Sequence, residues 1–328
     1  MEKRNFFRLT IPVILGIIIA VFVSGCSNDS SYPEKPIRLI VPYESGGQSD
    51  LTARKIAEII KEKELLDQPV NVTNMEGGNT QNGLQEVKDS KPDGYTLLFH
   101  HTALLTLNSI GDMDMGYEDF TPLGQAMEMP FVILANKDAP WDNIEEVLDE
   151  AKENPKDISV AVAGEGGAGY YALMQFLNES NSASDFKLKS YGGGSEAASQ
   201  QLGGHVDLRA ANMGDSLEYI NSDELKVLTS LTQEKNDRFP DVMTSKDVGV
   251  NNSFSLESGV LGPEGLPDDI KDEWNDVLKT VIESEEFQEF ADEQGGTPEF
   301  NTGDDWEKQL AEDQKEIDKV TEEISNDQ

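Results

Sequence analysis

Residues 37–47 read Ile-Arg-Leu-Ile-Val-Pro-Tyr-Glu-Ser-Gly-Gly, and these residues give the clearest indication of the fold class. Its first five residues form a short apolar run between two prolines, which indicates a buried strand. A glycine-rich turn follows, after which residues 49–64 place Leu51, Ile56 and Ile60 at helical spacing. A buried strand, a glycine turn and an amphipathic helix in this order predict a layered α/β protein.

The same alternation recurs along the chain. Further strands are expected at 70–73, 95–100, 131–135, 158–163, 186–191, 206–210 and 225–231, and further helices at 83–89, 143–153, 168–178 and 195–202. After Pro267 the pattern is helical, and the last helix carries one apolar face made of Trp306, Leu310, Ile317, Val320 and Ile324. We therefore expect an α/β fold with mainly parallel sheets flanked by helices.

The charge of the chain excludes some partners. Against 63 Asp and Glu there are only 26 Lys and Arg, so the formal net charge is -37. Nucleic acid would be repelled, because binding to it depends on Lys and Arg displacing counterions. Charge alone would not hold the chain on an anionic membrane either. A hydrophobic content of 37% still permits a core, and 328 residues suggest two domains.

The first 25 residues differ from the rest of the chain. A basic start precedes an apolar run at 11–23, and Val-Ser-Gly then leads to Cys26, the single cysteine. This pattern predicts a lipoprotein signal peptide at 1–25, cleavage before Cys26 and lipid attachment to its thiol. A signal-anchor helix with an incidental cysteine is the alternative. Residues 26–31 are expected to be a tether, and the mature chain would carry a net charge of -39, because the leader holds three bases and one acid.

Four glycine-rich turns separate strands from helices, at 44–47, 76–79, 164–167 and 192–195. Helices that begin at the carboxyl ends of strands point free N–H groups and a positive dipole end outward. Several such turns around one cleft would bind an anion without Lys or Arg. The alternative is that each glycine only closes a tight turn.

Other motifs carry little chemistry. Residues 164–169 have the form G-x-G-x-x-G, but the next strand ends in Tyr-Gly-Gly, without the acidic residue that a dinucleotide ribose requires. His100 and His101 alternate across a strand end and are expected to face opposite ways. We find no histidine pair with metal-ligand spacing and no nucleophile elbow. The sequence therefore predicts no cofactor, no metal and no catalytic centre.

Several segments together resemble a known family, the receptors of tripartite tricarboxylate transporters, also called Bug-type solute-binding proteins. The similar segments are 32–43 with Gly46, Gly47 and Asp50, then 91–98, 191–195, 202–208, and 260–263 with 266–267. The resemblance implies a two-domain periplasmic-binding-protein-like fold of the type II, venus flytrap kind. Domain 1 would hold 32–133 plus 254–328, and domain 2 would hold 134–253. The two crossings, near 132–136 and 254–259, would form the hinge.

The resemblance also implies a ligand site at the glycine turns. Carried over by position, it comprises Tyr43, Gly47, Ser49, Asp50, Gly78, Asn79, His101, Thr102, Gly166, Gly167, Ala168, Gly169, Tyr191, Gly194, Ser195 and Asn212. Asp50 would repel an anion, so we prefer for it the role of capping and charge-matching the helix start. His101 and Thr102 stand where the family has small residues. Arg209 is either a substitution with consequences for specificity or a surface base.

The function implied is a lipid-anchored, extracytoplasmic receptor on the bacterial cell membrane, at the cell surface or in the periplasm. It would capture a small organic carboxylate between its domains as a monomer and deliver it to the membrane permease subunits of a tripartite transporter. Two alternatives belong to other classes. One is an extracellular enzyme acting on an acidic metabolite, with Asp50 and His101 as candidate catalytic groups. The other is a ligand sensor for a membrane signalling partner.

Overall fold

The structure, a computed structural model, describes residues 32–78, 80–109, 115–164, 167–235, 239–251 and 254–326. The predicted signal peptide, the predicted tether and Cys26 therefore lie outside the described residues, as do Asn79 and Gly166 of the expected ligand site. Across these described ranges, no helix is both long enough and apolar enough to span a membrane.

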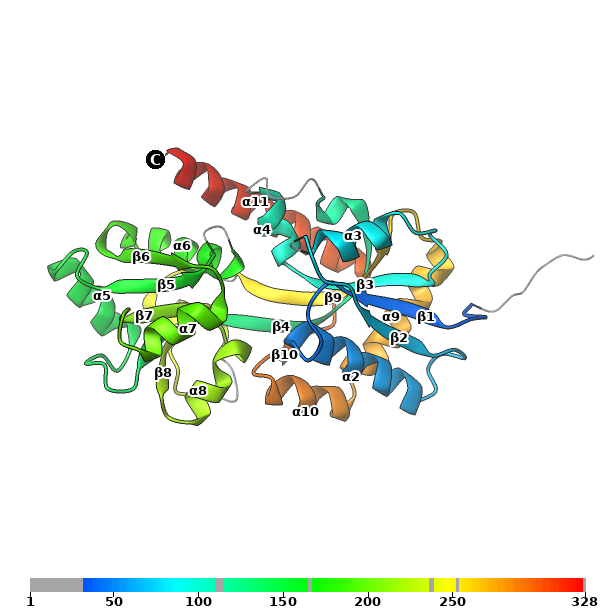
Figure 1. Cartoon of the computed structure of the whole chain (residues 1–328), viewed down its shortest axis with the longest axis horizontal. Helices are drawn as coiled ribbons and strands as arrows, with labels where there is room; N and C mark the ends of the chain where they lie inside the picture. The colour runs from blue at the N-terminus through cyan, green and yellow to red at the C-terminus, as the bar shows by residue number, and fades with distance from the viewer. Residues whose placement is uncertain are drawn as a thin grey trace, which may run out of the picture.

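The first strand–turn–helix unit forms where the sequence predicts it. β1 (Ile37–Val41) is almost fully buried and leads through the glycine turn into α2 (Gln48–Glu62). β2 (Val70–Asn74) and β3 (Thr96–His101) pair with β1 on either side, both parallel to it. α3 (Gln81–Lys88) connects β2 to β3. This group, with α9 and α10 from the end of the chain, is called the first lobe (Figure 1).

Two long strands run from the first lobe into the rest of the molecule (Figure 1). β4 (Phe120–Asn136) pairs with β9 (Ser255–Pro263) up to Pro130, and from Phe131 onward it pairs with β7 and β8. The sequence predicts only the 131–135 part of β4. Its first half was missed because Pro122 and Gly124 interrupt the apolar pattern, and the register shifts between them.

The second lobe is built from the segment between β4 and β9. It contains α5 (Ile144–Glu153), β5 (Ser159–Ala163), α6 (Ala168–Glu179), β6 (Lys187–Tyr191), α7 (Gly194–Leu202), β7 (Leu208–Asn212), the 3₁₀ turn η3 (Gly214–Ser216), α8 (Leu217–Asn221) and β8 (Leu225–Ser230). β5 pairs in parallel with β6 and β7, whereas β4 is antiparallel to its neighbours. The sheets are therefore mixed rather than mainly parallel, because β9 is antiparallel to β3 in the first lobe and β4 is antiparallel to β7 in the second lobe.

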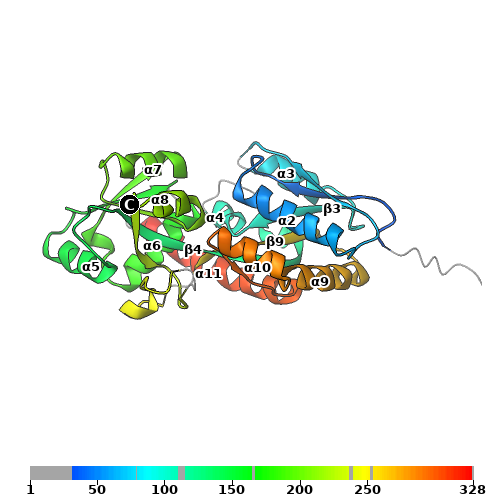
Figure 2. The same cartoon turned by 90° about the horizontal axis from the view of Figure 1, so that it is seen from below.

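The chain after Pro267 is mostly helical, as expected, with α9 (Asp268–Ile282), α10 (Glu285–Glu293) and α11 (Gly303–Asn326), and a short strand, β10 (Thr297–Pro298), before the last helix. Figure 2, from below, shows α9 and α10 beside α2 in the first lobe.

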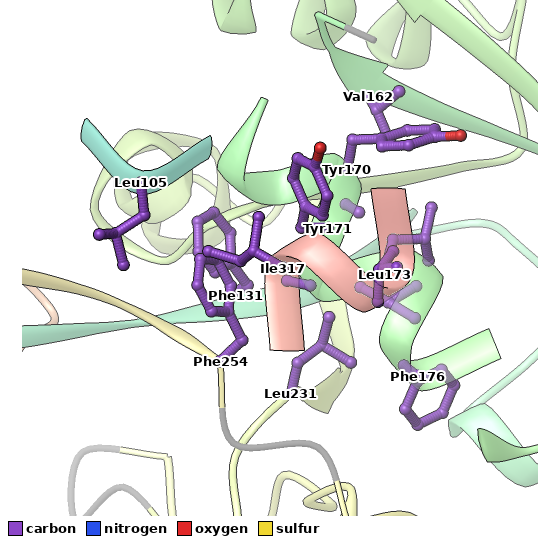
Figure 3. Packing of buried hydrophobic residues seen from close by; sticks show 14 of the residues in the cluster. Leu105, Phe131, Val162, Tyr170, Tyr171, Leu173, Phe176, Leu231, Phe254 and Ile317 are labelled. Atoms are coloured by element: carbon purple, nitrogen blue, oxygen red, sulfur yellow. The ribbon is translucent and has the colours of Figure 1, made fainter. Parts of the chain in front are cut away.

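Helix α11 contacts both lobes. It packs against β4, against α4 (Ala103–Ser109) and against α6 of the second lobe. Ile317 of α11 belongs to the same buried cluster as Phe131 and Leu173, whose side chains are seen together in Figure 3. The Tyr171 Oη and Thr321 Oγ1 atoms are hydrogen-bonded at 2.7 Å. The apolar face predicted for this helix therefore packs against both lobes, although the domain limits themselves stay a prediction.

Candidate functional site

A cavity of about 230 Å³ lies where α6, α7 and β7 of the second lobe meet the end of β3 and the crossing strands. This volume is below the roughly 300–1,000 Å³ of pockets for drug-sized ligands, so it suits a small solute. The cavity is lined by His101, Ala103, Phe131, Ala163, Ala168, Gly169, Gly194, Ala197, Arg209, Ala210, Ala211, Asn212, Asp215 and Leu256.

Two helices begin at this cavity. α6 starts at Ala168 after Gly167, α7 starts at Gly194 after Gly193, and neither N-terminal residue provides a side-chain cap. Their first N–H groups therefore remain available, together with the positive ends of two helix dipoles. A Cβ atom on Gly167 would lie 2.6 Å from the carbonyl oxygen of Ala163, so this position requires glycine. The second-lobe turns thus have the geometry expected of an anion site.

Arg209 is a buried cation at the cavity. Its side chain, on β7, is only 1% exposed, which rules out the surface-base alternative. Nε donates a hydrogen bond to Gln201 Oε1 at 3.1 Å, and Nη2 donates to Ser216 Oγ at 3.0 Å. Burial lowers the pKa of Arg209, but a guanidinium remains protonated at any physiological pH.

Asp215 is the acidic group of the cavity lining. Its Oδ2 accepts a hydrogen bond from Asn212 Nδ2 at 2.5 Å, and its backbone N–H donates to Asn212 Oδ1 at 2.9 Å. Desolvation in the cleft raises the pKa of Asp215, whereas Asn212 and the Arg209 charge lower it. The residue as a whole is exposed, so water also reaches the carboxylate.

His100 and His101 form one aromatic cluster with Tyr43, which contradicts the expectation that they face opposite ways. The two imidazole centroids are 5.1 Å apart, and His101 stacks on Tyr43 at 4.8 Å. Strand alternation fails here because β3 ends at His101, and the chain then turns into α4.

Hydrogen bonds assign the tautomers of both histidines. His100 Nδ1 lies 2.7 Å from the carbonyl oxygen of His101 and must donate to it, so His100 Nε2 accepts from the Tyr43 hydroxyl at 3.1 Å. His101 Nδ1 accepts from the Ala103 N–H at 3.2 Å, so its proton is on Nε2. Burial lowers the pKa of His100 to about 4 and that of His101 well below its usual value, so both are neutral at pH 7. His101 therefore offers the cavity a neutral donor.

The carboxylate of Asp50 is hydrogen-bonded to other groups of the protein itself. This buried carboxylate accepts hydrogen bonds from the Gly46 N–H at 2.8 Å, Arg54 Nε at 2.9 Å and Asn74 Nδ2 at 2.9 Å. Burial raises the pKa of Asp50, but these hydrogen bonds outweigh it and lower the pKa to about 2. This geometry favours the structural role at the start of α2, and it removes Asp50 as a candidate catalytic acid.

The structure brings some of the expected site residues together. Those that line the cavity are His101, Ala168, Gly169, Gly194 and Asn212. Outside the lining, Tyr43 stacks on His101, Gly167 and Tyr191 lie next to the second-lobe helices, and Ser195 lies within α7. Gly47 and Gly78 lie at the first-lobe turns, and Ser49 and Asp50 lie in the first turn of α2. Thr102 is 1% exposed, and its hydroxyl donates to the Ser255 carbonyl oxygen at 3.1 Å.

Sequence reasoning missed part of the lining. The apolar wall made by Phe131 and Leu256 comes from the crossing strands, which carry no local signal of a site. Asp215 was missed because η3 is too short to show a pattern. At the turn before α3, Thr80 has a left-handed backbone (φ 75°) and a buried hydroxyl that finds no partner among the described residues. Among those residues there is also no group of three His, Cys, Asp or Glu side chains that could hold a metal ion.

Two lobes joined by crossing strands, with a small cavity lined by helix N-termini, define a solute-binding protein. The family model described as "Tripartite tricarboxylate transporter family receptor" matches residues 52–325. The chain belongs to this family of periplasmic solute-binding receptors, which are not enzymes. The family resemblance and the periplasmic-binding-protein-like fold predicted from the sequence are confirmed, and the enzyme alternative is set aside.

Similar proteins support the same assignment. Protein BugT of Bordetella pertussis is 28% identical over 306 residues, which cover 92% of each chain. A TctC solute-binding protein from Polaromonas, solved without ligand, is 25% identical, has a TM-score of 0.77, and is matched over 89% of this chain and 100% of its own. MatC from Rhodopseudomonas palustris, solved with bound malate, shares the fold at 21% identity and a TM-score of 0.71, over 88% of this chain and 100% of its own.

Proposed function

We propose that this chain is a lipid-anchored extracytoplasmic receptor that binds a small organic carboxylate in the 230 Å³ cavity and delivers it to the permease of a tripartite tricarboxylate transporter. The observation that carries the proposal is the convergence of two uncapped helix N-termini and Arg209 on one small cavity. Related solved proteins hold malate and adipate, which are acids of a size that such a cavity can accept.

The proposed binding groups come from both sides of the cavity. The N–H groups at the start of α6 and α7 and the guanidinium of Arg209 would bind carboxylate oxygens, and His101 would donate from Nε2. The remaining turns expected from the sequence, at Gly47, Ser49 and Gly78, belong to the first lobe. We propose that they contact the solute when the lobes rotate about the two crossings near 132–136 and 254–259.

The experiment is a calorimetric and thermal-shift screen of the purified protein against lactate, malate, adipate and citrate. A bound solute should raise the free energy of unfolding by about 2.7 kcal/mol at a hundredfold excess over Kd. Absence of a shift with every acid would contradict the proposed solute class.

The lipid anchor needs its own test. We propose that Cys26 carries the lipid after removal of residues 1–25, on the basis of the sequence pattern alone. The Cys26→Ser variant should leave the membrane fraction for the soluble or secreted fraction, whereas the parent chain should stay with membranes. If both fractionate alike, the anchor is wrong, and the solute-binding proposal is unaffected.

A further inference from the structure

Arg209 carries a charge that the protein does not neutralise. Both hydrogen-bond partners of its guanidinium, Gln201 Oε1 and Ser216 Oγ, are neutral oxygens. Within the described part of the chain, Arg209 forms no ion pair at the 4.0 Å limit that defines one, although Asp215 lies close enough to influence its pKa. Arg209 is nevertheless buried, with only 1% of its surface exposed to water. A cation so placed is unfavourable until an anion joins it.

The guanidinium is also held in one orientation. Gln201 is itself fixed, because its Nε2 donates to the Leu134 carbonyl oxygen at 2.8 Å, and Ser216 Oγ donates to the Asn212 carbonyl oxygen at 3.1 Å. Two anchored partners therefore immobilise a planar group whose five N–H donors match a carboxylate. The rest of these donors have no hydrogen-bond partner in the described residues, and Arg209 lines the cavity.

A purely structural role explains this arrangement less well. Tying α7 and η3 to β7 requires hydrogen bonds but no net charge, and a neutral amide would do so without the cost of burying a cation. The Arg209 charge instead lies beside the positive ends of the α6 and α7 dipoles, so that all three contribute to a positive potential in the cavity. Asp215 opposes them, but it is bound to Asn212 and exposed to water.

We propose that Arg209 is the specificity-determining residue of this receptor, and that its guanidinium takes one carboxylate of the solute as its counter-ion. The consequence is discrimination by charge: the site accepts an acid and rejects the amide of the same shape. Backbone N–H groups alone discriminate less, because they also donate to a neutral carbonyl oxygen. The inference rests on the proposed function and adds the residue that selects the anionic form.

The test measures Kd by calorimetry for malate, adipate and any other acid that binds in the screen, each beside its amide, with the wild-type protein and four variants. Wild type should bind the acid at least about tenfold more tightly than the amide. Arg209→Gln should weaken acid binding about 10- to 100-fold, in line with the loss of a charge-assisted hydrogen bond. It should leave amide binding within about threefold, and Arg209→Lys should recover part of the preference.

Two further variants keep the result interpretable. Arg38→Gln removes the same charge from the surface, where Arg38 pairs with Glu86 at 3.0 Å, and should leave both Kd values unchanged. Asp215→Asn removes the opposing charge and should tighten acid binding, which tests the proposal even if Arg209→Gln does not fold. If wild type binds acids but Arg209→Gln or Asp215→Asn keeps the wild-type ratio of acid to amide, the inference is overturned and the receptor function stands. If wild type binds neither acid in this assay nor any acid of the screen, the receptor function itself fails.

Discussion

Single residues in this protein show how strongly local contacts decide the role of a charge. Asp50 and Arg209 both sit near expected anion sites, and from the sequence a capping role is preferred for Asp50 whereas two roles stay open for Arg209. The structure separates them by their partners. Asp50 is surrounded by Gly46, Arg54 and Asn74, whereas Arg209 has only neutral partners and faces a cavity. A buried charge with a full set of partners is structural, and one without a counter-ion is available to a ligand.

Asp50→Asn should destabilise the protein by about 1–3 kcal/mol, because the substitution turns a charged acceptor into an amide facing other donors. The folded-state pKa of Asp50 is lowered to about 2, so its contribution is present above the unfolded pKa of 3.8 and is lost as pH falls toward 2. Urea unfolding of wild type and variant at pH 7 and pH 3 should therefore show a gap that narrows with acid. Asp67→Asn, at an exposed acid, is the control, and a gap of equal size at both pH values would contradict this account.

The pKa of Glu257 is shifted in the opposite direction to that of Asp50. Glu257 lies on β9 directly across from Glu128 of β4, and its Oε2 accepts a hydrogen bond from Trp306 Nε1 at 3.0 Å. Burial, with Asp313 as a further cause, raises the pKa of Glu257 to about 8. A group whose folded pKa is raised stabilises the protein below its unfolded pKa, near 4.5, and this contribution is lost as pH rises through about 8.

Glu257→Gln should therefore flatten the dependence of stability on pH between about 5 and 8. Glutamine keeps an acceptor for Trp306 and does not ionise, so the variant should melt at a higher temperature than wild type at pH 8. The difference in the free energy of unfolding between variant and wild type at pH 8 should be on the order of one to a few kcal/mol, since one pKa unit corresponds to about 1.4 kcal/mol. Differential scanning calorimetry from pH 5 to pH 8.5 measures it, and parallel curves for the two proteins would show that Glu257 does not titrate in this range.

At the scale of elements, strand–turn–helix units were predicted well. Residues 37–41 form β1 as expected, and α6 begins at Ala168 as expected, because the period of apolar residues is local information. The first half of β4 was missed since its bulges at Pro122 and Gly124 hide the strand pattern. The cluster of Tyr43, His100 and His101 was missed because it depends on where β3 ends. Some residues expected at the glycine turns line the cavity, whereas the wall from the crossing strands was not predicted.

The start of α6 provides a prediction about a glycine turn. Gly167→Ala places a Cβ 2.6 Å from the Ala163 carbonyl oxygen, and backbone atoms cannot easily give way. We expect a loss of about 1–3 kcal/mol in stability and weaker solute binding, because the first N–H groups of α6 are displaced. Gly193→Ala is the matched control at the start of α7, since a Cβ there meets no atom within 4 Å. Chemical denaturation and calorimetry compare the two, and equal effects would contradict the steric explanation.

At the scale of the whole molecule, the charge of -37 is a property of the solvent-facing helices rather than of the cavity. The exposed acids of α5 and α11 illustrate it, whereas the cavity lining combines Arg209 with one acid. Such a charge repels itself and is screened at high salt, where the Debye length is about 3 Å at 1 M.

The melting temperature should accordingly rise from low salt to molar NaCl. The expected cause is screening between acids, so KCl should act like NaCl at equal ionic strength. Thermal melts at pH 7 over this range are the measurement. A flat or falling curve would mean that self-repulsion does not limit the stability of this protein.

Helix α11 has a mechanical consequence. The two crossing strands, β4 and β9, would by themselves allow the lobes both to bend and to twist relative to each other. Because α11 contacts both lobes, a twist of one lobe against the other would move α11 sideways across one of the lobes. The helix therefore reduces the number of independent motions of the lobes. The hydrogen bond between Tyr171 and Thr321 is one such fastening on α6. Under the proposed rotation of the lobes, α11 would either slide along α6 and change the distance between these two side chains, or move together with α6 and keep that distance.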